Sequence, residues 1–158
     1  MQYEEGAVEL SKYRLETAES TYRMAELCYE NGGYRDAVNR SYYAAFYALR
    51  AVLALEGTDF KRHKDVVAYF NQHYVATNKF AREIGKRIGR LKTMREDCDY
   101  DDFYVIERDE VLEQLRTADM VINAVKQYLN KQEEIQSILK VQGAQHEDTK
   151  QTKKQQNV

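Results

Sequence analysis

The stretch Tyr34-Arg-Asp-Ala-Val-Asn-Arg-Ser-Tyr-Tyr-Ala-Ala-Phe-Tyr-Ala-Leu-Arg-Ala-Val-Leu-Ala-Leu-Glu56 decides the fold class of this chain. It is apolar on more than one helical face, which is typical of a helix surrounded by other elements. Its alanines permit neighbouring helices to approach closely, and its aromatic residues fill the space beside them. Glycines at 32, 33 and 57 bracket the stretch, and glycine readily adopts the left-handed conformation that ends helices. We therefore predict a central helix over residues 34–56.

Four further helices are predicted from apolar residues spaced three and four apart. They cover about residues 8–30, 63–75, 79–97 and 107–132, with an irregular, acidic and aromatic connection over residues 97–105. The chain has no proline and only seven glycines, which favours long helices over strands and turns. The predicted fold is an all-α, antiparallel up-and-down bundle of about five helices.

The length of 158 residues indicates a single domain. We assign residues 1–132 to the helical bundle and residues 133–158 to a polar, flexible and largely disordered tail, because Gln, Lys and Glu dominate there. A few apolar residues, Ile135 to Val141, leave open a solvent-exposed continuation of the last helix to about residue 141.

Charge and cysteine content narrow the class of protein. The 24 basic and 26 acidic residues nearly balance, so overall charge favours neither binding nor exclusion of nucleic acid. Cys28 and Cys98 lack the spacing of a metal site or a CxxC pair, which fits a reducing compartment. No apolar run approaches the roughly 20 residues of a membrane span. We expect a cytoplasmic protein without membrane contact, metal or cofactor.

Several common catalytic motifs are absent from the sequence. It has no glycine-rich phosphate loop, no HExxH, no zinc spacing and no GxSxG. P-loop nucleotide hydrolases, zincins and α/β-hydrolases are therefore excluded.

Two polar residues stand out on faces otherwise suited to packing. Arg40 has Tyr43, Ala44 and Tyr47 at helical spacing, and a buried guanidinium needs an anionic or carbonyl partner. That partner is either an internal carboxylate, Asp99 or Asp101, or an external phosphate. His63 follows Arg62 at the start of a predicted helix, where it is either an ordinary surface histidine or a general acid and base.

The fourth predicted helix carries two further features. It ends in Arg95-Glu-Asp-Cys-Asp-Tyr100, where Arg95 and Asp99 are four residues apart and can form an ion pair. It is also strongly basic, with Lys79, Arg82, Lys86 and Arg90 on one face and Arg87 at its edge. Such a stripe is either a solvated surface or a contact for a phosphate backbone.

Four segments, in order, resemble the HEPN domains (higher eukaryotes and prokaryotes nucleotide-binding), above all the small stand-alone proteins of bacteria and archaea. They are Asn39-Arg-Ser-Tyr-Tyr-Ala-Ala-Phe-Tyr-Ala-Leu-Arg50, Lys61-Arg-His-Lys-Asp-Val66, Phe70-Asn-Gln-His-Tyr-Val75 and Arg95-Glu-Asp-Cys-Asp-Tyr100. The resemblance covers roughly residues 8–130. It implies a helical bundle, a homodimer, and in many members a toxin paired with a nucleotidyltransferase antitoxin.

Many HEPN proteins are metal-independent ribonucleases whose motif is Arg, four to six residues, then His, near the dimer interface. By resemblance Arg95 is the motif arginine, but no histidine follows it at that distance. A replacement site would use His63 and Asp99 with Arg95 as catalytic residues. Arg40, Tyr43, Arg62 and Tyr100 would then bind the nucleotide or its phosphate.

Two functions follow as competing hypotheses. The first is the nucleotide- or RNA-binding component of a toxin–antitoxin or defence module, with ribonuclease activity as a special case. The second is a non-catalytic helical module that docks a nucleotidyltransferase partner. The first predicts that Arg40, His63, Arg95, Asp99 and Tyr100 converge near a two-fold axis.

Overall fold

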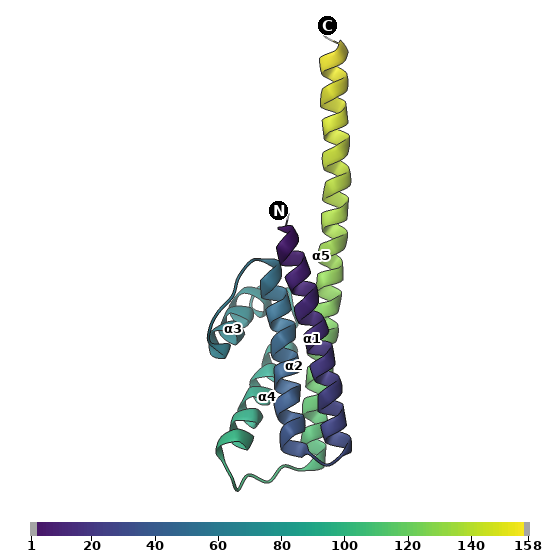
Figure 1. Ribbon diagram of the computed structural model, residues 1–158. Coiled ribbons are helices and arrows are strands. Elements are labelled where there is room, and N and C mark those ends of the chain that lie inside the picture. The colour runs from purple at the N-terminus through teal and green to yellow at the C-terminus, as the bar shows by residue number, and fades with distance from the viewer. Residues whose placement is uncertain (1–2, 157–158) are drawn as a thin grey trace. The chain divides into compact units, whose positions relative to one another are not determined.

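The computed structural model describes the backbone of residues 3–156 and the side chains of residues 3–145 (Figure 1). It contains five α-helices: α1 (Glu5–Glu30), α2 (Tyr34–Leu55), α3 (His63–Phe70), α4 (Arg82–Tyr100) and α5 (Arg108–Gln156). A short π-helical turn, η1 (Asn71–Val75), continues α3. The described residues contain no strand, so the predicted all-α fold is confirmed.

Helix α2 is the central element, as its sequence predicts. Of its 22 residues, 14 are buried, and it packs against α1, α3 and α4. Leu49 and Leu53 are fully buried, and truncating such a side chain typically costs about 2–5 kcal/mol. The reversal between α1 and α2 requires glycine at position 32, whose φ is +77°.

Helices α1 and α2 lie side by side and antiparallel (Figure 1). Their interface uses small residues, among them Ala18 and Ala25 of α1, which are fully buried. The buried hydroxyl of Ser11 donates a 2.7 Å hydrogen bond to the main-chain carbonyl of Ala51. Small side chains and side-chain hydrogen bonds from Ser11 and Arg14 to carbonyls of α2 therefore hold the two helices close together.

The third predicted helix, 63–75, is present as α3 followed by η1. Helix α4 approaches this turn closely at Gly85, where an added Cβ would lie 3.1 Å from Asn71 Oδ1 and 3.3 Å from Val75 Cγ1. The absence of a side chain at position 85 therefore permits the packing of α4 against η1.

Helix α4 begins and ends three residues later than the predicted range of 79–97. Asn78 has a left-handed backbone with φ +62°, and Ala81 is extended, so residues 79–81 precede α4. At the other end α4 continues to Tyr100, and the irregular connection begins only at Asp101. The extension places Asp99 on the same helical face as Arg95.

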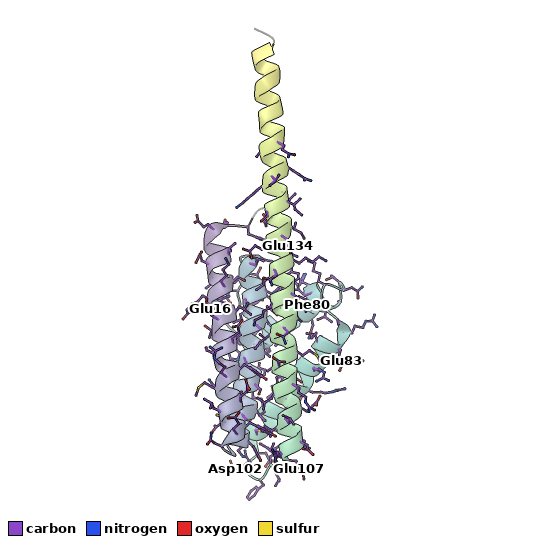
Figure 2. The ribbon with its side chains drawn as sticks, turned by 90° about the vertical axis from the view of Figure 1, so that its right-hand side faces the viewer. Glu16, Phe80, Glu83, Asp102, Glu107 and Glu134 are labelled. Atoms are coloured by element: carbon purple, nitrogen blue, oxygen red, sulfur yellow. The ribbon has the colours of Figure 1, made fainter. Side chains whose placement is uncertain are left out.

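The connection between α4 and α5 is fastened to the start of α2 by one side chain. The guanidinium of Arg35 donates hydrogen bonds to four main-chain carbonyls, those of Cys98, Asp101, Asp102 and Tyr104. Figure 2 shows the connection at one end of the bundle, where Asp102 and Glu107 are labelled. Arg35 thus holds a segment whose Phe103 and Val105 side chains remain exposed.

The chain comprises two units, one ending at Lys126 and a second beginning at Gln127. In the first unit α5 buries an apolar stripe: Val111, Leu115, Ala118, Val121, Ile122 and Val125. An ion pair of 3.0 Å joins Lys126 of α5 to Glu19 of α1, and another of 2.8 Å joins Arg87 of α4 to Glu113 of α5.

The second unit is the remainder of α5, helical to Gln156. Among its described side chains, Ile135, Ile138, Leu139 and Val141 are apolar and exposed. Composition predicts a flexible tail over residues 133–158, and the structure shows helix where a largely disordered chain was expected. Isolated helices are marginally stable in water, and the flexibility of this segment stays a prediction.

Candidate functional site

Tyr43 lies at the centre of a cluster of aromatic and cationic side chains. It projects from the middle of α2 and is only partly buried. Its ring centroid is 5.4 Å from that of Tyr42, 6.1 Å from that of Tyr47 and 5.6 Å from that of His63. The ring therefore links the surface of α2 to the beginning of α3.

Arg95 reaches this cluster from α4. Its Nε lies 3.1 Å from Asp99 Oδ2, and its Nη2 donates a long hydrogen bond of 3.4 Å to the Tyr43 hydroxyl. Its Cζ is 4.9 Å from the Tyr42 ring centroid and 5.4 Å from that of Tyr43, within the range of cation–π attraction. With the side chain only 18% exposed, the guanidinium is held in one place by these contacts.

Arg40 contributes a second guanidinium near the same tyrosine ring. Its Cζ is 5.2 Å from the Tyr43 centroid, and its Nη2 donates a 2.8 Å hydrogen bond to Asn39 Oδ1. The internal carboxylate partner considered for Arg40 is not present among the described residues: Asp99 pairs with Arg95 instead. Arg40 is therefore a cation neutralised by no described carboxylate.

His63 is the first residue of α3, and its ring packs against α2. The imidazole centroid is 4.2 Å from that of Phe46 and 5.6 Å from that of Tyr43. Burial, together with the positive charges of Arg95 and Arg50, lowers the pKa of His63 from its ordinary value of 6.5. The imidazole is therefore mainly neutral at pH 7 and able to accept a proton.

Two of the predicted site residues lie outside this network of contacts. Arg62 is exposed, and its Nε forms a 2.8 Å ion pair with Asp65. Tyr100 is 81% exposed and takes part in none of the described contacts of the cluster. The structure thus brings together Arg40, Tyr43, His63, Arg95 and Asp99, which we call the Tyr43 cluster.

A small pocket beside His63 was not predicted from the sequence. Its volume is about 330 Å³, and it is lined by Phe46, Arg50, Asp59, Phe60, Lys61 and His63. Arg50 lies seven residues after Tyr43 on α2, two turns along the same face, and this spacing could have revealed it. The pocket and the Tyr43 cluster share His63 as a common wall.

Asp59 lines this pocket and is paired with two arginines from different helices. Arg14 Nη2 and Arg50 Nη2 each lie 3.2 Å from Asp59 Oδ2. Burial by itself raises the pKa of Asp59, but the hydrogen bond from the Phe60 amide and the two guanidinium charges outweigh it, so the pKa is lowered. The carboxylate therefore stays ionised at neutral pH and neutralises much of the charge of Arg50.

On the basic face of α4 some cationic side chains are exposed and another forms ion pairs. Arg82, Lys86 and Arg90 are exposed, and a surface hollow of about 500 Å³ lies beside the last two. Arg87 is instead held by Glu83 at 3.2 Å and Glu113 at 2.8 Å. Lys79 precedes the helix, with its Nζ 5.1 Å from the Tyr74 ring centroid.

Two further features of the described residues bear on the kind of site. Among the described residues no group of three or more His, Cys, Asp or Glu side chains is arranged to hold a metal ion. None of the described helices combines the length and the apolar character that crossing a bilayer requires.

The Tyr43 cluster has the chemistry of an anion-binding site with a proton acceptor at its edge. Two guanidinium groups lie within 5.4 Å of the centre of one phenol ring. Guanidinium is well suited to phosphate because it is planar and always charged. The neutral imidazole of His63 lies next to the same ring. The arrangement can hold a phosphate group and can accept a proton from a neighbouring hydroxyl.

Comparison with known proteins gives a consistent result. A family model described as "HEPN domain" matches residues 11–128. A "UPF0332 protein" of Thermotoga maritima is 34% identical over 105 residues, which cover 66% of this chain and 80% of that protein.

Two proteins of Methanocaldococcus jannaschii, each named "Putative toxin", are 31% and 30% identical over 115 residues. The match covers 73% of this chain and 78% and 85% of those proteins, respectively. The family match spans all of α2, α3 and α4 and most of α1. On this evidence, the chain belongs to the HEPN domain family.

Proposed function

We propose that this chain is a toxin-like HEPN module that binds the phosphate of a nucleotide or RNA at the Tyr43 cluster. The single observation that carries this proposal is the placement of two guanidinium groups, from Arg40 and Arg95, over one tyrosine ring. Arg40 has no described carboxylate partner, so its charge remains available to an external anion. The names of the two archaeal relatives support a toxin-like role.

Ribonuclease activity is the more specific form of the proposal. Neutral His63 would accept the proton of an RNA 2′-hydroxyl as that oxygen attacks the adjacent phosphorus, while the 5′-oxygen leaves and takes up a proton. Arg40 and Arg95 would stabilise the charge that builds on the phosphate oxygens. Asp99 would act as a positioning residue, since its carboxylate fixes the Arg95 guanidinium. No metal ion is needed for this step.

The pocket beside His63 would receive the base next to the reacting phosphate. Phe46 and Phe60 offer aromatic surfaces, and base–aromatic stacking is worth about 1–3 kcal/mol per base. The exposed cations of α4, Lys86 and Arg90, would contact the RNA backbone further along the chain. Single-stranded RNA fits this combination of stacking surface and basic face.

We further propose that the module works with a nucleotidyltransferase antitoxin and as a homodimer, as its family membership suggests. The competing function is a non-catalytic module that docks such a partner. It is favoured by one observation: Arg95 is already paired with Asp99 and contacts the Tyr43 hydroxyl, as expected for a structural network.

RNA cleavage by the purified chain in the presence of EDTA tests the proposal. His63→Gln is compared with His73→Gln, the same change outside the cluster. Arg95→Lys is compared with Arg116→Lys in the same way. Both control residues are exposed. We expect the cleavage rate to fall by at least about 100-fold in His63→Gln and Arg95→Lys, the usual scale for losing an acid–base group or a donor that stabilises developing charge. The rate should be unchanged in the two control variants.

The same variants separate binding from cleavage. RNA that binds the wild-type chain but remains intact, with affinity reduced by Arg40→Ala, would remove the ribonuclease step and keep the phosphate-binding role. Neither binding nor cleavage, with the fold verified by circular dichroism, would reject the proposal in favour of the docking module.

A further inference from the structure

The pocket beside His63 has walls that suit one planar ring system. Its volume of about 330 Å³ is at the lower end of the range for small-ligand sites. Two aromatic rings, of Phe46 and Phe60, line it together with the guanidinium of Arg50 and the carboxylate of Asp59. A nucleobase matches these walls, because it is flat and carries hydrogen-bonding groups along its edge.

The polar groups of the pocket follow one another in a fixed order away from His63. The imidazole centroid lies 4.2 Å from that of Phe46, and the Arg50 Cζ lies 5.9 Å from the same phenyl centroid. Arg50 Nη2 in turn lies 3.2 Å from both carboxylate oxygens of Asp59, which follows the end of α2. The charge of Arg50 acts on the pKa of His63, whereas Asp59 is not among the charges that do so. The guanidinium is therefore the nearer of the two charged groups.

The carboxylate of Asp59 can act only as an acceptor. Three donors hold it: the Phe60 amide at 2.9 Å, Arg14 Nη2 at 3.2 Å and Arg50 Nη2. These contacts keep its pKa below the ordinary value, so the group is ionised at neutral pH. A carboxylate has about four acceptor positions, so one is left for a ligand. The side chain is 53% exposed, which leaves that position open.

The guanidinium of Arg50 can act only as a donor, and part of it is unused. Its described side-chain hydrogen bonds use Nη2 alone, and both go to Asp59. Nη1 has no described acceptor, and Nε is buried without one. Buried donors without an acceptor are uncommon in folded proteins. This guanidinium is therefore suited to an acceptor from outside the chain.

The pocket thus offers a donor near His63 and an acceptor further away. A base whose ribose lies at His63 presents its ring nitrogen first and its far exocyclic group second. In cytosine and adenine the ring nitrogen accepts and the exocyclic amino group donates, which matches Arg50 and Asp59 in that order. In uracil and guanine the two groups are reversed: a ring N–H would face the guanidinium, and a carbonyl would face the carboxylate.

We infer that this pocket selects an amino base, cytosine or adenine, over the keto bases uracil and guanine. The inference rests on the proposed function, because it takes the ribose and phosphate to lie at His63 and the Tyr43 cluster. Arg50 donates to the ring nitrogen, and Asp59 accepts from the amino group. Rejection of the keto bases, which bring like groups together, supplies much of the selectivity. Lys61 also lines the pocket, but it is exposed and held by no described contact, so its charge favours no base.

Strands that differ in this one edge test the inference. Short 2′-deoxy homopolymers are used, because without a 2′-hydroxyl they cannot undergo the proposed cleavage. Cytosine and uracil strands form one pair. Adenine and hypoxanthine strands form the other, since hypoxanthine carries a carbonyl in place of the amino group of adenine. With dissociation constants of the full chain measured by fluorescence anisotropy, the amino base should bind about tenfold tighter in each pair.

Asp59→Asn tests where the preference originates. An amide donates through its nitrogen as well as accepting through its oxygen, so a carbonyl is no longer rejected and the preference should fall to within about twofold. Asp65→Asn is the matched control, because Asp65 pairs with the exposed Arg62 and does not line the pocket. The control should keep the preference of the wild-type chain.

The outcomes separate this inference from the proposed function. Equal binding of all four strands, weakened by Arg40→Ala, would keep the phosphate site and overturn the base selectivity. A preference for uracil and hypoxanthine would overturn it too, as would an amino-base preference that Asp59→Asn leaves intact. Binding of none of the strands, with helical content retained by circular dichroism, would reject the proposed function and the inference together.

Discussion

The imidazole ring of His63 lies 4.2 Å from the ring of Phe46, tilted by 40°. This contact shields one face of the imidazole from water, which disfavours its protonated form. The positive charges of Arg95 and Arg50 disfavour that form as well. Both effects act in the same direction. They lower the pKa of His63 and so favour the neutral imidazole at pH 7.

The first prediction concerns pH and stability. Because the pKa of His63 is lower in the folded chain than its ordinary value of 6.5, the unfolded chain binds the proton more tightly. The free energy of unfolding should therefore be at its full value above pH 6.5 and fall as the pH drops below it. Urea unfolding at pH 7.5 and pH 5.5 measures this difference, which His63→Gln should reduce. An equal difference in both proteins would show that other groups cause the loss.

The second prediction concerns Arg35. Arg35→Ala removes the donor shared by four carbonyls, so the connection between α4 and α5 should become mobile and the chain should lose about 1–3 kcal/mol of stability. Hydrogen exchange should rise over residues 99–107 and stay slow in α1. Arg23→Ala, on the exposed surface of α1, is the control and should leave exchange of the connection unchanged.

The third prediction compares two glycines of α4 that are one turn apart. An alanine Cβ at position 85 would meet Asn71 Oδ1 at 3.1 Å, so Gly85→Ala should destabilise the chain, by about 1 kcal/mol. At position 89 nothing lies within 4 Å, and Gly89→Ala should stabilise it by about 0.5–1 kcal/mol. Thermal denaturation measures both. The same sign for the two changes would contradict the close approach of α4 to η1.

The fourth prediction concerns the basic face of α4. If Lys86 and Arg90 contact an RNA backbone, replacing each by alanine should weaken binding and reduce the slope of log K against log salt by about 0.7 per contact. Arg87→Ala serves as the control, because Glu83 and Glu113 already neutralise that side chain. Slopes that do not differ among the three variants would remove α4 from the proposed RNA path.

Local sequence signals were sufficient for the helices and for part of the site. Periodicity located α2 almost to the residue, since apolar pattern and flanking glycines agree there. The Arg95–Asp99 pair also follows from local spacing, since both residues lie on one helix. The start of α4 was missed because Phe80 is buried and fits the apolar spacing, although it precedes the extended residue Ala81 and lies outside the helix.

The remaining features depend on contacts between residues far apart in the chain. Arg14 and Asp59 are 45 residues apart, and Arg35 and Tyr104 are 69 apart, so no local pattern relates them. The same holds for the pocket beside His63. Of the two alternatives left open for Arg40, the internal carboxylate is not found among the described residues, because Asp99 pairs with Arg95 on its own helix.

The hydrogen bonds of Arg35 also limit how two copies of this chain can associate. Exchange of α5 between protomers would require the connection after α4 to open into an extended hinge. Opening it would break the bonds from Arg35 to the carbonyls of Asp101, Asp102 and Tyr104 and expose those groups again. Each protomer should therefore retain its own last helix, and association should take place between complete, already folded chains.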